Sequence, residues 1–174
     1  MYASHQETLN ERGKKHDNTK EWDKILLPII WLLVYFIIYF VAGMSIRFEW
    51  SRLPMGWFYA GTALYLISCV FVIWPVMVNK HFESTSRIQD NRDHRVITTG
   101  PYRIVRHPGY TGIVIWAIAS AFMFGTLAVG IVSFTIIVMI CVRTNLEDNM
   151  LKNELDGYVN YSKTVRYRLL PFVW

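Results

Sequence analysis

The residues most able to do chemistry gather in two polar segments, 79–112 and 143–148. The first contains the run Arg106-His107-Pro108, in which two side chains that can bind anions precede a proline. Because a proline disfavours helix in the residue before it, we expect His107 in an extended chain or a turn that leads into an apolar helix. Helix N-termini attract anionic groups, so this arrangement is suited to holding a charged ligand.

The second polar segment, RTNLED, places Arg143 and Glu147 four residues apart. On a helix these side chains share a face, and one interpretation is a simple pair worth about 0.2–0.5 kcal/mol. The functional interpretation is that both line a polar cavity at a membrane boundary, where ionisable residues are costly. The first segment can also be interpreted structurally, with Arg103 and Arg106 anchoring the membrane surface and His107 capping the next helix.

Long uncharged runs must position these two segments. Residues 25–46 and 56–78 hold 22 and 23 residues without a charge. At about 1.5 Å per residue, each is long enough to cross a hydrocarbon core of about 30 Å. We expect Pro28 in the first turn of the first helix, and Pro75 to kink or end the second.

The run from 109 to 142 is too long for one ordinary span, and Gly125-Thr126 offers a break. Two helices at about 110–124 and 127–148 would form a tight hairpin. The sequence therefore predicts an all-α integral membrane protein with about four transmembrane helices. A cytoplasmic loop and a C-terminal amphipathic helix complete it.

The distribution of basic residues favours four spans over three. Lys and Arg number 5 before residue 25, 2 in 47–55, 6 in 79–108 and 5 from 143 onward. With four spans the three richer segments share one side, which the positive-inside rule makes cytoplasmic. We expect a multi-pass protein of the cell membrane with both termini cytoplasmic.

Composition excludes several classes of protein. Of 174 residues 53% are hydrophobic, which excludes a disordered chain, and the 2 cysteines lie inside apolar runs, which excludes a disulfide scaffold. The net charge of +5 does not indicate nucleic-acid binding, because no basic helix with interleaved aromatics is present. No GxGxxG, P-loop or GxSxG motif occurs, neither cysteine has a histidine at a zinc-binding spacing, and we expect no metal.

The sequence GPYRIVRHPGYTG, an apolar hairpin and then RTNLEDNMLKNELDGYVNYSKTVRYRLLP together resemble the isoprenylcysteine carboxyl methyltransferase family, in a bacterial or archaeal-type member. The wider group includes phospholipid N-methyltransferases. The likeness covers about residues 79–174, and the two leading helices match only in being apolar. Membrane sterol reductases share a related RHPNY motif and a similar tail.

The resemblance implies S-adenosyl-L-methionine as cofactor, without a Rossmann domain. It assigns Glu147 to the cofactor ammonium, Arg or His groups to the cofactor carboxylate, and Arg143 to the catalytic, acceptor side. Asp148 stands where many relatives carry a second Glu. The implied cofactor-binding residues are Gln89, His94, Arg95, Val96, Ile97, Gly100, Tyr102, Arg106, His107, Pro108, Tyr110 and Glu147.

The domain plan is then a polar tail (1–24) and one membrane methyltransferase domain (25–174), with a cofactor loop (79–109) and a C-terminal segment (149–174). In that last segment we interpret Tyr158 and Tyr161 as interfacial packing.

The implied activity is methyl transfer to a lipophilic or lipid-modified acceptor in the membrane, first a carboxylate and second a phospholipid amine. Catalysis would rest on proximity and orientation. An NADPH-dependent sterol-type reductase and a non-catalytic scaffold are two competing hypotheses for the same motifs.

Overall fold

The computed structural model describes residues 18–89 and 94–174, and within these ranges every regular element is helical. The elements in chain order are α2 (Glu21–Leu32), η1 (Leu33–Ile37), α3 (Ile38–Arg47), α4 (Gly56–Val78), η3 (Gly100–Arg103), α5 (Pro108–Phe124), α6 (Leu127–Glu154) and α7 (Tyr158–Thr164). The all-α prediction is confirmed for this part of the chain. The predicted polar tail up to residue 17 lies outside the described residues, as do positions 90–93 of the predicted cofactor loop.

The first long helix begins earlier than its apolar run. α2, η1 and α3 form one helical rod of 27 residues from Glu21 to Arg47, in which η1 is a π-helical segment. Pro28 therefore lies well inside α2, and its expected place in the first turn is wrong. Asp23 belongs to the first turn of this helix rather than to a polar tail.

The predicted break between the last two long helices is confirmed. α5 ends at a left-handed Gly125 (φ 64°), a conformation that glycine adopts without steric cost. The Thr126 hydroxyl then accepts a hydrogen bond from the Val129 amide (3.3 Å) and caps the N-terminus of α6. α6 continues to Glu154, beyond the expected end at 148, so the residues after the apolar run extend the same helix.

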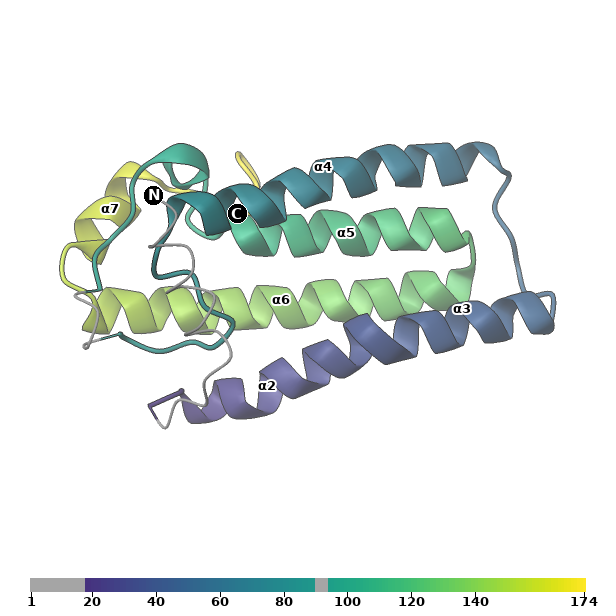
Figure 1. Cartoon of the computed structure of the whole chain (residues 1–174), viewed down its shortest axis with the longest axis horizontal. Coiled ribbons are helices and arrows are strands. Elements are labelled where there is room, and N and C mark those ends of the chain that lie inside the picture. Colours follow the sequence, from purple (N-terminus) through teal and green to yellow (C-terminus); the bar gives the residue numbers. More distant parts are fainter. Residues whose placement is uncertain (1–17, 90–93) are drawn as a thin grey trace.

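The long helices lie side by side in the order α4, α5, α6 and then α2–α3 (Figure 1). α4 packs most closely on α5, and a side chain at Gly112 would come within 2.7 Å of Val72. α2 and α3 pack instead on α6. The loop 79–89, α7 and the C-terminus lie at one end of the bundle, and the turn at Gly125 lies at the other.

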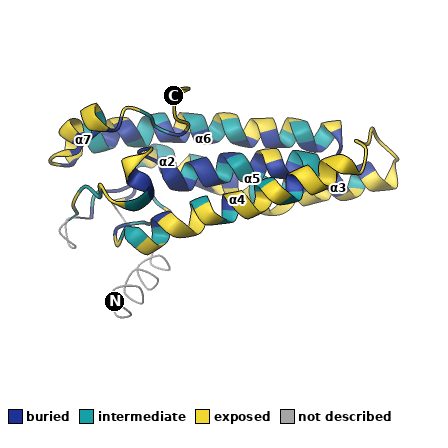
Figure 2. Cartoon of the chain, turned by 90° about the horizontal axis from the view of Figure 1, so that it is seen from above, coloured by how far each residue is buried: buried dark blue, intermediate teal, exposed yellow. Residues whose placement is uncertain are grey.

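In the part of the chain that the structure describes, three helices are long and apolar enough to span a membrane: Glu21–Arg47, Gly56–Val78 and Leu127–Glu154. α5 is a shorter apolar helix of 17 residues. Large hydrophobic side chains are exposed along α2, α3 and α4, whereas α5 and α6 carry more buried residues (Figure 2). An apolar exposed surface of this kind is expected for helices that face lipid. The four-span topology and the cytoplasmic termini stay predictions.

A small hydrophobic core lies at the end of the bundle that carries α7. Tyr102, Tyr158 and Tyr161 are buried there with Leu155 and Val165. The expectation that Tyr158 and Tyr161 pack at the membrane interface is wrong. Both side chains face inward, because α6 stops at Glu154 and the left-handed Gly157 (φ 80°) redirects the chain into α7.

Candidate functional site

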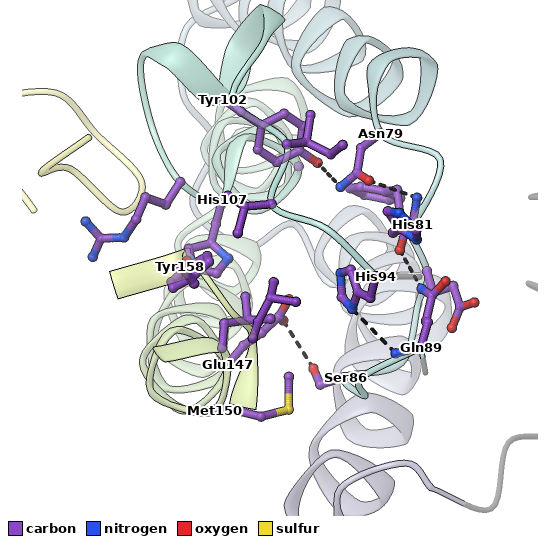
Figure 3. Close-up of a pocket in the computed structure, with 18 of the residues that line it drawn as sticks. Asn79, His81, Ser86, Gln89, His94, Tyr102, His107, Glu147, Met150 and Tyr158 are labelled. Atoms are coloured by element: carbon purple, nitrogen blue, oxygen red, sulfur yellow. Dashed lines mark hydrogen bonds between the residues drawn. The ribbon is translucent and has the colours of Figure 1, made fainter. Parts of the chain in front are cut away.

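A polar cavity of about 110 Å³ lies at the end of the bundle that carries α7 and is partly open to solvent. Figure 3 shows His81, Gln89 and His94 on one side of the cavity and His107, Glu147 and Tyr158 on the other. The loop segments 79–89 and 94–97, the start of α5, and parts of α6 and α7 therefore all contribute to its walls.

Almost all residues predicted to hold the cofactor line this one cavity. Gly100 is the exception: it begins the short helix η3, and a side chain there would lie 3.0 Å from Val78. The predicted residues that the cavity brings together are Gln89, His94, Arg95, Val96, Ile97, Tyr102, Arg106, His107, Pro108, Tyr110 and Glu147.

Glu147 presents a carboxylate with one oxygen held by the protein. Its Oε2 accepts a hydrogen bond from the Tyr110 hydroxyl and another from Ser86 Oγ (3.1 Å). Among the described residues no donor contacts Oε1, and Glu147 lines the cavity. This carboxylate is therefore positioned by two hydroxyl groups and can accept a further hydrogen bond from a cationic ligand.

The ring of His107 is positioned by the carboxylate of Asp148, which is fully buried. The His107 Nε2 lies 3.4 Å from Asp148 Oδ1, and the Tyr158 hydroxyl contacts both groups, at 3.3 Å from Nε2 and 3.0 Å from Oδ1. The His107 amide also donates to the Arg168 carbonyl (2.9 Å). The C-terminal segment thus fixes the backbone of His107, and Asp148 fixes its ring.

Arg106 makes its contacts within the protein. Its Nε and Nη2 donate to the two oxygens of Asp148 (2.7 and 3.1 Å), and its Nη1 donates to the carbonyls of Val165 and Arg166. Burial lowers the pKa of Arg106, but the hydrogen bond and charge of Asp148 outweigh this effect and raise it overall. These contacts indicate a structural role for the Arg106 guanidinium at the rim of the cavity.

The two tyrosines of α7 are neutral hydrogen-bond donors. Burial, followed by the charge of Asp148, raises the pKa of Tyr158 far above its usual value. Burial likewise raises the pKa of Tyr161, whose hydroxyl donates to the Tyr102 carbonyl (2.7 Å). Both phenols therefore stay protonated at any physiological pH, so they position other groups rather than exchange protons.

Hydrogen bonds organise the loop that faces α7. Asn79 Nδ2 donates to the Tyr102 hydroxyl (3.0 Å), and Asn79 Oδ1 accepts from the His81 amide (2.8 Å). The Gln89 side chain donates to the His81 carbonyl (2.7 Å), and the Gln89 amide lies 3.4 Å from His94 Nδ1. Gln89 thus shapes the loop while it lines the cavity (Figure 3).

A second, mostly apolar cavity lies beside the first, between α2–α3 and α4. Residues from Leu27 to Tyr39 line one side and residues from Tyr65 to Val76 line the other. Phe82, Glu83, Gly109 and Tyr110 border both cavities. A polar ligand in the first cavity and an apolar one in the second would therefore meet at this shared wall.

Arg143 lies at the polar end of the second cavity. Its Nε and Nη2 donate to the two oxygens of Asp23 (2.7 and 3.1 Å), and Nη2 also donates to the Ser84 carbonyl. The guanidinium carbon lies 5.3 Å from the centre of the Tyr110 ring. Nη1 has no hydrogen-bond partner among the described residues. The simple pair with Glu147 is wrong, because Arg143 pairs with Asp23.

Sequence reasoning missed Asp23, Ser86, Tyr158 and Tyr161. A signal existed for Asp23, because an acidic residue beside a membrane-spanning run is a functional candidate by default. The tyrosines and Ser86 carry no local signal, since only the folded loop and α7 bring them to the cavity. Within 18–89 and 94–174, no group of three His, Cys, Asp or Glu side chains is placed to hold a metal ion.

Comparisons with known proteins identify relatives of this chain. The model of the "Isoprenylcysteine carboxyl methyltransferase (ICMT) family" matches residues 61–153. A rice protein (Oryza sativa subsp. japonica) named "Probable protein-S-isoprenylcysteine O-methyltransferase" is 37% identical over 70 residues, which are 38% of this chain and 37% of that protein. "Protein-S-isoprenylcysteine O-methyltransferase B" of Arabidopsis thaliana is 28% identical over 101 residues, 56% of this chain and 50% of that protein.

A third relative, "Protein-S-isoprenylcysteine O-methyltransferase" of Schizosaccharomyces pombe, is 30% identical over 93 residues, 52% of this chain and 39% of that protein. The chain thus covers between 37% and 50% of the length of these relatives. They are plant and yeast proteins, so the expectation of a bacterial or archaeal-type member stays a prediction. The family model, however, matches more than half of the chain and includes the cavity residues from Asn79 to Leu151. The chain therefore belongs to the isoprenylcysteine carboxyl methyltransferase family.

Proposed function

We propose that this protein transfers a methyl group from S-adenosyl-L-methionine to a lipophilic acceptor, with a carboxylate of the isoprenylcysteine type as the first choice. The observation that carries the proposal is the wall shared by a polar cavity and an apolar cavity, which Gly109 and Tyr110 border together with Phe82 and Glu83. The relatives' names point to the same reaction.

The residues of the polar cavity suit the proposed cofactor. Glu147 offers its carboxylate oxygen Oε1 to an ammonium, and His94 and Arg95 can balance a carboxylate. Tyr102 supplies an aromatic surface, and Val96 and Ile97 also line the wall. When bound, S-adenosyl-L-methionine supplies an electrophilic methyl group on a sulfonium, and the sulfur keeps the electron pair of the broken bond.

The apolar cavity suits the acceptor. Its walls are mostly apolar side chains of α2–α3, α4 and α5. The main packing partner of α2 is α6, so a chain-like ligand can enter from the lipid between α2 and α4. At the polar end, the Nη1 of Arg143 can donate to an acceptor carboxylate. Such a carboxylate is already ionised at neutral pH, so no general base is required. The protein's contribution is to hold the acceptor oxygen in line with the methyl group at the Gly109–Tyr110 wall.

A second acceptor class is a phospholipid amine. Asp23 already balances the charge of Arg143, and Glu147 adds a negative charge close by. Arg143 with these two carboxylates nearby attracts an anionic acceptor less strongly than an arginine without them would. This weaker attraction favours the phospholipid amine.

Transfer of a labelled methyl group separates the two acceptor classes. The detergent-solubilised protein is incubated with labelled S-adenosyl-L-methionine and either an N-acylated farnesylcysteine or phosphatidylethanolamine. We expect base-labile label, the mark of a methyl ester, on the farnesylcysteine. Base-stable label on phosphatidylethanolamine alone would favour the amine, and label on neither would count against both.

A further inference from the structure

Asp23 is a buried carboxylate that comes from outside the part of the chain matched by the family model. Its side chain is 0% exposed, and its two oxygens accept from Nε and Nη2 of Arg143. Its Oδ2 also accepts from the Ser86 amide (2.7 Å). These three donors balance the buried charge of the Asp23 carboxylate, and the two bonds from Arg143 fix its guanidinium group in one orientation.

The start of α2, where Asp23 lies, is itself tied to the cofactor loop and to α6. The Lys20 amide donates to the Ser86 carbonyl (3.2 Å), and Lys20 Nζ pairs with Glu154 (2.7 Å). Asn18 Nδ2 donates to the Ile88 carbonyl (3.1 Å). The position of Asp23 is therefore set by several contacts around it and not by Arg143 alone.

Without Asp23, Arg143 has a competing partner. Glu147 lies four residues further along α6, the spacing at which arginine and glutamate side chains pair on a helix. Glu83, a carboxylate that borders the second cavity, is already held by two hydrogen bonds from Arg87 (2.8 and 2.9 Å). An Arg143 released from Asp23 would therefore turn toward Glu147 and occupy the oxygen offered to the cofactor.

The contacts around Asp23 close a ring that joins the two cavities. Asp23 holds the Ser86 amide, and Ser86 Oγ donates to Glu147. Glu147 accepts a hydrogen bond from Tyr110, whose ring lies beside Arg143. Arg143 in turn donates to Asp23, which completes the ring of contacts. Within this ring, Glu147 and Arg143 each have one side fixed by the protein and one atom left for a ligand.

We propose that Asp23 is a positioning residue that keeps Arg143 away from Glu147 and directs the remaining guanidinium nitrogen, Nη1, into the acceptor cavity. This role deepens the proposed function and rests on it. Asp23 contacts the cofactor site only through the Ser86 amide, and its removal should impair that site through Arg143.

The test measures affinity for S-adenosylhomocysteine by calorimetry in Asp23→Ala, Arg143→Ala and the double variant. We expect Asp23→Ala to weaken binding about tenfold or more, and the added Arg143→Ala to restore it to within about threefold of the unaltered protein. The matched control is Glu21→Ala, because Glu21 lies in the same turn of α2, is 87% exposed and pairs with Lys24. It should bind as the unaltered protein does. Since loss of a buried partner is destabilising, Asp23→Asn, which keeps the side-chain volume, is measured alongside.

Unchanged affinity in Asp23→Ala, or a double variant as weak as Asp23→Ala, would overturn the proposal. A second measurement needs no ligand: Glu147→Gln should lower the Tm more in the Asp23→Ala background than in the unaltered protein, because only there does Arg143 reach Glu147. An equal effect in both backgrounds would also overturn the proposal. Failure of the unaltered protein to bind S-adenosylhomocysteine would instead refute the proposed function, and the Tm comparison would still decide the role of Asp23.

Discussion

Glu147→Gln tests the assignment of the cofactor ammonium. Oε2 of Glu147 is held by Tyr110 and Ser86, whereas no described residue donates to Oε1. A hydrogen bond to a charged group contributes about 1.5–3 kcal/mol, which corresponds to about 10- to 150-fold in affinity. The glutamine keeps the shape of the side chain and an acceptor for the two hydroxyl donors. We therefore expect weaker binding in a protein that still folds.

The assay is calorimetric titration of the detergent-solubilised variant with S-adenosylhomocysteine, which carries the same ammonium as the cofactor. Glu154→Gln is the matched control, since Glu154 lies on the same helix and pairs with Lys20 away from the cavity. The control should bind within about twofold of the unaltered protein. If Glu147→Gln bound equally well, Glu147 would not contact the cofactor, and the assigned orientation of the ligand in the cavity would be refuted.

Three further substitutions test other parts of the site. Arg143→Ala should lower turnover at least tenfold and leave S-adenosylhomocysteine affinity within about threefold, because Arg143 lies on the acceptor side; lost cofactor affinity would contradict that role. Asp148→Ala should lower the free energy of unfolding by about 3–5 kcal/mol, measured by denaturation in detergent, because it leaves the buried Arg106 unpaired; a loss under about 1 kcal/mol would contradict this. Gly109→Ala should reduce turnover about tenfold, since the new methyl group would lie 2.8 Å from the Phe82 ring at the shared wall. Unchanged turnover would show that this wall tolerates displacement.

Local sequence signals predicted the helices better than their ends. The break at Gly125-Thr126 was predictable, because a left-handed glycine and a capping threonine act through their own backbone. The start of α2 and the end of α6 were not, because polar residues such as Asp23 and Glu154 join the helices through partners distant in sequence. An apolar run marks what lipid can cover, and the helix extends wherever tertiary contacts stabilise further turns.

The same distinction applies to the site. Pro108 and Tyr110 lie close in sequence to His107, so their motif brings them to the cavity together. Arg143 and Glu147 follow from a helical spacing, but their pairing did not, because the partner of Arg143 is 120 residues away in the sequence. The contacts that Arg106 makes with Asp148 were equally invisible, since only the packing of α6 against the start of α5 creates them. Residue types and spacing thus predict which side chains are available, and the fold decides which of them meet.

Calorimetric titration with S-adenosylhomocysteine and, in parallel, with NADPH tests the proposed chemistry most directly. The RHPxY loop and the tail also occur in membrane sterol reductases, so the two ligands separate the two reaction classes. The polar cavity with Glu147 predicts saturable binding of S-adenosylhomocysteine and none of NADPH. Binding of NADPH alone would contradict the methyltransferase proposal and favour a reductase, and binding of neither would favour a non-catalytic scaffold.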